Sequence, residues 1–187
     1  MARQVTSHDG QRGQRWRIVG WSLAGAILLV PLVAMQLTSD VVWTLGDFLF
    51  FGALIGMIGA GYEVLARRGG GLYRLAAAVA LAAAFLMIWS NAAVGIIGDE
   101  GNPANAMFAG VLLVAVVGAL VARLRAAAMA RAMAATAAAQ VLIAVIAIVG
   151  RMGAGDPLWP RDIILITGFF TALWLIAAAL FARAART

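Results

Sequence analysis

Cysteine is absent from the 187-residue chain. Its absence excludes disulfide bonds, thiolate metal sites, iron–sulfur clusters and a cysteine nucleophile. Lysine is absent as well, and the only histidine, His8, lies in a polar tail. Charged residues make up 12% of the chain, about half of the usual share in a soluble globular domain. The composition therefore argues against a soluble protein and against histidine-dependent membrane enzymes.

Catalytic motifs are missing too. The sequence contains no HExxH, P-loop or GxSxG motif, and these motifs identify the main metalloprotease, nucleotide-hydrolase and serine-hydrolase sites. The acidic residues cluster at the ends of apolar runs, so no pair of carboxylates is expected deep in a membrane. We therefore expect no enzyme activity, no catalytic residue, no metal and no cofactor.

Long apolar runs dominate what is present, and 64% of the residues are hydrophobic. A helix needs about 20 mostly apolar residues to cross a bilayer, and six stretches satisfy this. They predict an all-α polytopic membrane protein with one transmembrane domain over residues 18–182, between polar tails at 1–17 and 183–187. The predicted spans are 18–37, 42–66, 72–97, 103–122, 132–150 and 160–182.

The arginines predict the orientation of these spans. Twelve of the 14 lie in the N-terminal tail, in the loops after the second and fourth spans, and in the C-terminal tail. Six of the eight acidic residues lie on the opposite side, so the two sides carry net charges of +10 and −4, consistent with the total of +6. Positive loops stay in the cytoplasm. The pattern predicts that both termini are cytoplasmic, in a bacterial inner membrane, and it disfavours nucleic acid as a partner.

A cleaved signal peptide is an alternative for the first span. The chain starts with a basic region and an apolar core, followed by small residues near 33–35. The apolar run is about 20 residues long, whereas a signal peptide has roughly 7–15. Cleavage would leave five helices with the same loop orientation.

Three predicted outer turns share a pattern at the start of the following helix. Thr44 precedes Asp47, Asn102 precedes Asn105, and Pro160 precedes Asp162. One interpretation is three pseudo-repeated helical hairpins. The other is helix capping, because Thr and Asn are good N-caps, Pro suits the first helical position, and a side chain at the third position can reach back to a free N–H.

The most distinctive stretch is residues 91–105, which read NAAVGIIGDEGNPAN. An amide side chain inside a span normally needs a polar partner, and carboxylate and amide oxygens suit hard cations. The stretch is therefore a candidate contact for an ion or small ligand, with solvated side chains on a tight glycine turn as the structural alternative. The candidate contact residues are Asn91, Asp99, Glu100, Asn102 and Asn105.

Residues 91–105 also carry a resemblance. They are similar to the central loop of a family of short bacterial inner-membrane proteins, and residues 35–48 and the Tyr62–Glu63 pair look similar too. The resemblance implies six helices from the first span onward. It implies no activity and no functional residues.

Glycines on the second span predict close helix packing. Gly52 and Gly56 form a GxxxG motif that Gly59 continues, and small residues let a neighbouring helix approach closely. The neighbour can come from the same chain or from another. Glu63, one turn before Arg67, is expected to form an ion pair with it, although a proton relay is the alternative for an intramembrane carboxylate.

These features predict a non-enzymatic scaffold or an accessory subunit of a membrane complex. Its expected partners are the lipid bilayer and either other membrane subunits or further copies of the chain. The alternative is a small transporter, channel or substrate-capture subunit with a polar outward mouth. That alternative predicts a cavity between helices that is lined by Asn91 and Trp89.

Overall fold

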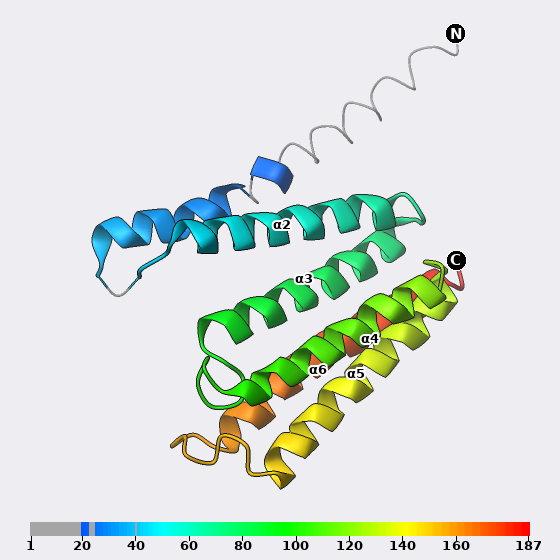
Figure 1. The fold of residues 1–187 in the computed structure, drawn as a ribbon. Helices are drawn as coiled ribbons and strands as arrows, with labels where there is room; N and C mark the ends of the chain where they lie inside the picture. Colours follow the sequence, from blue (N-terminus) through cyan, green and yellow to red (C-terminus); the bar gives the residue numbers. More distant parts are fainter. Residues whose placement is uncertain (1–19, 23–24, 40) are drawn as a thin grey trace. The chain divides into compact units, whose positions relative to one another are not determined.

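The computed structural model describes residues 20–22, 25–39 and 41–187. These residues contain six helices that are long and apolar enough to cross a membrane, and they contain no strand. The all-α prediction is therefore confirmed, and the helices fit a multi-pass membrane protein (Figure 1). The predicted tail at 1–17 lies outside the described residues. The elements are Gly20–Leu37, α2 (Leu45–Ala66), α3 (Gly71–Ala93), the 3-10 helix η1 (Pro103–Met107), α4 (Phe108–Val121), α5 (Ala126–Val149) and α6 (Arg161–Ala184).

Two helix boundaries differ from the predicted spans by several residues. The third span was expected to reach residue 97, but α3 ends at Ala93 because the chain turns at Gly95, whose φ of 75° is unsuited to a right-handed helix. The fifth was expected to start at residue 132, but α5 starts at Ala126. Its first turns are alanine-rich and place Arg131 on the exposed side of the helix, where a charged side chain is tolerated.

The chain divides into two compact units after Gly59, within α2. In the first unit, Trp43 stacks on Phe51 with ring centroids 4.9 Å apart, and Phe48 meets Trp43 edge-on. Gly59 faces the Trp21 ring, and a Cβ at this glycine would lie 2.7 Å from Cη2 of that ring. The prediction of a single domain over residues 18–182 stays a prediction.

The second unit contains α3 to α6. Helix α6 packs against both α3 and α5, and α5 also packs against α4 (Figure 1). Small residues allow these close approaches, as is usual between membrane helices. A Cβ at Gly118 of α4 would lie 2.8 Å from the Cβ of Ala132 in α5. The buried alanines include Ala76, Ala77, Ala80 and Ala83 of α3, Ala132, Ala137, Ala144 and Ala147 of α5, and Ala177 of α6.

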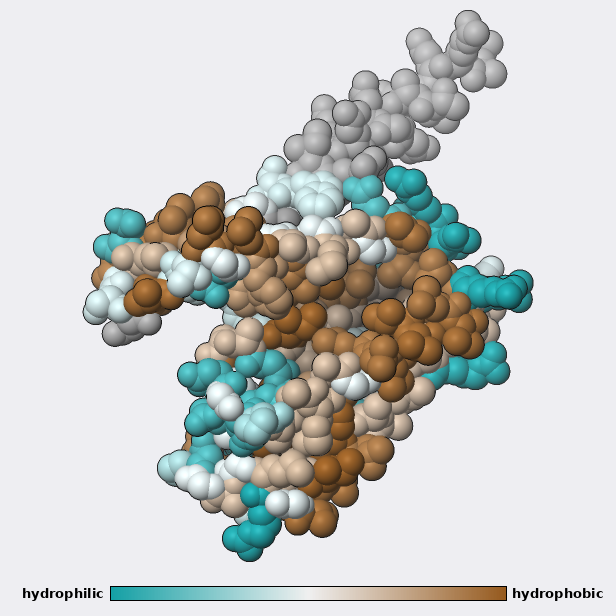
Figure 2. All heavy atoms as spheres, viewed as in Figure 1, coloured by the Kyte–Doolittle hydropathy of each residue, from teal (hydrophilic) through white to brown (hydrophobic). Residues whose placement is uncertain are grey.

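Large side chains fill the space between the alanines of this unit. Phe170, Trp174 and Phe181 of α6 are almost fully buried, as are Met87 of α3 and Phe108 of α4. Trp174 lies in the middle of the predicted sixth span, and its burial shows that it packs against other helices rather than facing lipid. Apolar residues also cover the helix sides, while hydrophilic residues gather at the helix ends (Figure 2).

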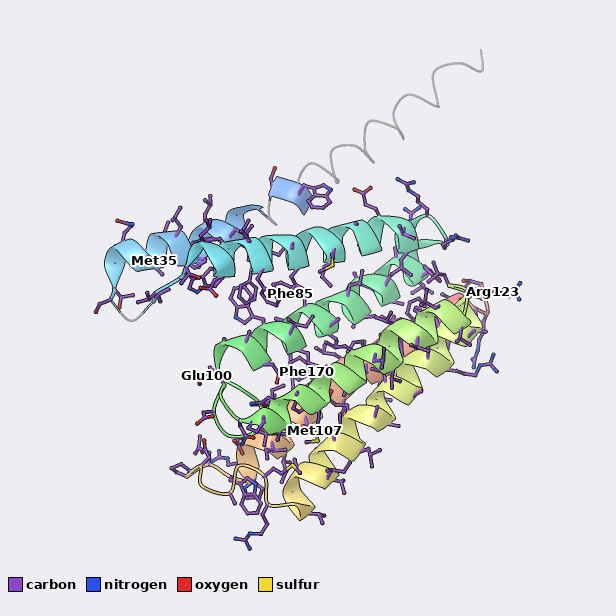
Figure 3. All side chains as sticks on the ribbon, viewed as in Figure 1. Met35, Phe85, Glu100, Met107, Arg123 and Phe170 are labelled. Carbon is purple, nitrogen blue, oxygen red and sulfur yellow. The ribbon has the colours of Figure 1, made fainter. Side chains whose placement is uncertain are left out.

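The second unit has two chemically different ends. We call the end with Asp99, Glu100, Asp156 and Asp162 the acidic end, and the end with Arg67, Arg68, Arg123 and Arg125 the arginine end. Glu100 and Arg123, which lie at the two ends, are labelled in Figure 3. Near the arginine end, Glu63 pairs with Arg67 at 3.7 Å, which confirms the expected ion pair.

Candidate functional site

The turn between α3 and η1 folds back onto the acidic end of the second unit. After α3, Gly95 and Gly98 take φ values of 75° and 68°, which are accessible to glycine at little cost. They reverse the chain so that Ile96 and Ile97 are buried against the helices. The glycines therefore place two apolar side chains inside and leave the backbone of residues 96–99 in need of hydrogen-bond partners.

Asn105 supplies those partners. Its Oδ1 accepts hydrogen bonds from the backbone N–H groups of Ile96 at 2.9 Å and Ile97 at 2.8 Å. Its Nδ2 donates to the carbonyl oxygen of Asp99 at 2.8 Å and, more weakly, to that of Ile97 at 3.4 Å. Both ends of one amide are thus used to hold the turn, which reduces what Asn105 can offer to a ligand.

The N-cap predictions hold for two helices. In the first unit, Asp47 Oδ2 accepts from the backbone N–H and the hydroxyl of Thr44, both at 2.7 Å, and the N–H of Asp47 donates to Thr44 Oγ1. In the second unit, Asn102 Oδ1 accepts from the N–H of Ala104, and Pro103 takes the first position of η1. Capping therefore accounts for Thr44, Asp47 and Asn102.

The remaining turn residues behave differently from the capping prediction. Asn105 reaches back to residues 96–99 instead of Asn102. Pro160 precedes α6 as its N-cap, and Asp162 Oδ1 accepts from the N–H of the next residue, Ile163. The three turns thus use different hydrogen bonds, and the three pseudo-repeated hairpins stay a prediction.

The five candidate contact residues do not converge on one point. Asp99 and Glu100 are exposed, and the backbone of Asp99, not its carboxylate, bonds Asn102 and Asn105. Glu100 lies at the tip of the turn (Figure 3). Among the described residues, no group of three or more His, Cys, Asp or Glu side chains could hold a metal ion.

Asn91 and Asn105 do share a surface groove of about 330 Å³ between α3 and the start of α4. Its walls are apolar and include Ile88, Phe108 and Leu112. Asn91 Nδ2 donates to the carbonyl of Met87 at 3.0 Å, but Asn91 Oδ1 is buried without a partner. Trp89 does not line the groove. The groove therefore offers a ligand one free hydrogen-bond acceptor, Asn91 Oδ1, among apolar side chains.

The helix-packing glycines Gly52 and Gly56 have more room than a close helix contact leaves. Within the first unit, a Cβ at Gly52 would meet only a Leu28 methyl at 3.8 Å, and one at Gly56 would meet nothing within 4 Å. Gly59 is different because it faces the Trp21 ring. A partner for Gly52 and Gly56 stays a prediction.

Sequence reasoning missed a group of buried polar side chains in α5 and α6. Gln140 of α5 is fully buried, and neither its Oε1 nor its Nε2 has a hydrogen-bond partner. The hydroxyls of Thr167 and Thr171 and the indole N–H of Trp174, all in α6, are buried and unpartnered as well. Gln140 is nine residues from the end of α5, roughly 13 Å along the helix axis. The sequence did offer a signal for this burial, because Gln140 is an isolated polar residue in a long apolar run.

Replacing Gln140 with leucine is expected to raise the free energy of unfolding by about 1 kcal/mol. The amide is buried without partners, so an apolar side chain of similar size removes an unmet hydrogen-bonding demand. Denaturant unfolding in mixed detergent micelles measures the change.

Thr136→Val is the matched control for this substitution. Thr136 is equally buried on α5, but its hydroxyl donates to the carbonyl of Ala132 at 2.9 Å, so its loss is expected to cost about 0.5–1 kcal/mol. A Gln140→Leu variant that is less stable than Thr136→Val would show that the amide has a polar partner.

Comparisons with known proteins do not assign the chain to a family. The resemblance of residues 91–105 to a family of bacterial membrane proteins accordingly stays a prediction. No family model, curated protein or solved structure matches the chain.

Proposed function

We propose that the chain is a non-enzymatic scaffold or accessory subunit of a membrane complex. The observation that carries this proposal is the use of polar side chains at the acidic end: Asn105 and Asn102 are bonded to the backbone of their own turn. These polar side chains stabilise the fold of the turn. A scaffold acts through its apolar helix faces, where it meets lipid and other membrane helices.

Helix α4 offers such a face. Val111 of α4 is buried against its own unit, whereas Leu113, Val117 and Leu120 are exposed. The packing of α4 within the unit is confined mainly to α5 and η1, so much of its surface is open to a neighbour. Association of helices in a bilayer depends on packing of this kind of surface.

Photo-cross-linking from α4 tests whether this helix contacts a partner protein, as the scaffold proposal requires. A photoreactive residue at Val117 is expected to yield one protein adduct of defined mass in native membranes, and one at the buried Val111 is expected to yield none. Native mass spectrometry after gentle extraction should show the same adduct partner at a fixed stoichiometry. Lipid adducts alone, together with a strictly monomeric species, would contradict the proposal.

We also propose a cytoplasmic location for both termini, in a bacterial inner membrane. The support is the separation of charge, with Arg68, Arg123 and Arg125 lining one pocket at one end of the second unit and Asp99 and Glu100 exposed at the other. Arginine-rich loops are retained in the cytoplasm.

Cysteine labelling checks this orientation, since the chain has no cysteine of its own. A membrane-impermeant maleimide is expected to modify Glu100→Cys in intact spheroplasts and Arg186→Cys only after permeabilisation. Both positions are exposed, so differences in labelling report the side of the membrane. The reverse pattern would place the arginine end outside.

A small transporter, channel or substrate-capture subunit is the second candidate. The groove beside Asn91, with its buried and unpartnered Oδ1, favours it, because pockets for small molecules combine apolar walls with a few polar groups. Asn91→Leu would then abolish ligand-dependent stabilisation or flux, and Glu100→Gln, which alters an exposed residue, would not. Equal behaviour of the two variants would remove this candidate.

A further inference from the structure

A large pocket lies at the arginine end of the second unit. It has a volume of about 820 Å³ and forms where three chain segments meet. These are the loop before α3, the loop between α4 and α5, and the end of α6. The residues that matter for its chemistry are Arg68, Gly70, Gly71, Arg123 and Arg125.

Three arginines give this pocket a positive charge that exceeds the single negative charge of the α-carboxylate of Thr187, which also lines it. Within the described part of the chain, no carboxylate lies within 4 Å of Arg68, Arg123 or Arg125, and the nearby Glu63 is paired with Arg67. The positive ends of two helices add to this charge, since neither α3 nor α5 has a side-chain cap at its first turn. The pocket is therefore suited to an anion.

The loop between α4 and α5 is held in place by a side chain of α3. The hydroxyl of the buried Tyr73 donates to the carbonyl of Leu124 at 2.7 Å, and its ring packs edge-on against Phe181 at 5.0 Å. Arg123 and Leu124 take φ values of 48° and 59°, a left-handed conformation that is costly for residues other than glycine. Tyr73 thus fixes a strained loop whose two arginines line the pocket.

We propose that this pocket binds a phosphate group, with a phospholipid headgroup as its source. Guanidinium groups bind phosphate oxygens through paired hydrogen bonds, and basic pockets between transmembrane helices are typical sites for anionic headgroups. The pocket opens at the ends of membrane-spanning helices, where headgroups lie. Leu72 and Ala126, which also line it, give an apolar flank for the lipid.

Titration of phosphatidylglycerol into the detergent-purified protein tests the proposal, with bound lipid counted by native mass spectrometry. Each of Arg68→Gln, Arg123→Gln and Arg125→Gln is expected to weaken saturable binding about fivefold. The matched control is Arg131→Gln, which removes the same charge from an exposed site that does not line the pocket. Its effect is expected to stay below about twofold.

Tyr73→Phe separates the shaped pocket from general attraction between charges. It keeps the aromatic packing and every charge, but it releases the carbonyl of Leu124. Tyr73 acts as a positioning residue, so the loss of its hydroxyl in Tyr73→Phe is expected to weaken lipid binding about threefold. The dependence of binding on salt should stay as in the wild type, because the number of arginines is unchanged.

Two further measurements complete the test: competition with inorganic phosphate distinguishes a lipid headgroup from free phosphate, and folding controls exclude misfolded variants. Inorganic phosphate at millimolar concentration is expected not to compete with phosphatidylglycerol; full competition would overturn the headgroup as the source. Helical circular dichroism and a monodisperse elution profile establish that each variant is folded. Equal binding by the three pocket variants and Arg131→Gln would overturn the site itself.

Discussion

Replacing Asn105 with alanine is expected to lower the free energy of unfolding by about 3–5 kcal/mol. The Oδ1 atom of Asn105 accepts from the N–H groups of Ile96 and Ile97, and both isoleucines are buried. Each buried donor left without an acceptor costs about 1–3 kcal/mol, and the bond to the carbonyl of Asp99 is lost as well. Unfolding by denaturant in mixed detergent micelles measures the loss.

Two further substitutions on the same turn test this explanation. Asn105→Asp keeps an acceptor for Ile96 and Ile97 but loses the donor to Asp99, so its cost is expected to be about half that of Asn105→Ala. Glu100→Gln alters an exposed side chain at the tip and is expected to change stability by less than about 0.5 kcal/mol. If Asn105→Ala proved as mild as Glu100→Gln, the turn would not depend on this amide.

Gly95→Ala is expected to be comparably damaging, at about 2–5 kcal/mol. A residue with a Cβ in the left-handed region costs about 1–2 kcal/mol, and the φ of Gly95 is 75°. The new Cβ would also lie 2.4 Å from the carbonyl oxygen of Asp99 and 2.8 Å from Asn105 Nδ2. The backbone must shift to relieve these contacts, and overpacking of this kind costs about 1–3 kcal/mol.

Gly101→Ala is the matched control for Gly95→Ala. Its Cβ would meet only the Asp99 carboxylate, at 3.5 Å, and its φ lies outside the positive region, so a change below about 1 kcal/mol is expected. Amide hydrogen exchange at Ile96 and Ile97 gives a local readout: it should accelerate in Gly95→Ala and stay slow in Gly101→Ala. Similar exchange in the two variants would contradict the proposed strain.

The six helices were predictable because crossing a bilayer requires a long apolar run, and each run is visible in the sequence. Their ends were less so. The sequence predicts that the loop extends to Arg131, yet α5 includes this residue because an exposed arginine can extend its charge to water from a helical position. Conversely, the apolar character of Ile96 and Ile97 predicts that they continue the third helix, but they belong to a turn.

The roles of the polar residues depended on contacts that local rules do not describe. Capping rules concern neighbours within one helical turn, whereas Asn105 bonds a backbone up to nine residues away. The close approach of Gly118 in α4 to Ala132 in α5 was not singled out from the sequence, whereas Gly52 and Gly56 of the GxxxG motif in α2 have no contact as close. The burial of Gln140 likewise depends on how the helices pack around α5.

The two turns at the acidic end of the second unit meet at two glycines, Gly98 and Gly153. A Cβ at Gly153, which precedes α6, would lie 3.0 Å from the backbone nitrogen of Gly98. Backbone contacts of this kind leave little compliance. In mechanical terms we expect the turn after α3 and the turn before α6 to move together, so that a displacement of α6 would also displace the turn after α3. At the arginine end the corresponding link is the hydrogen bond from the Tyr73 hydroxyl to the carbonyl of Leu124, which ties α3 to the loop after α4.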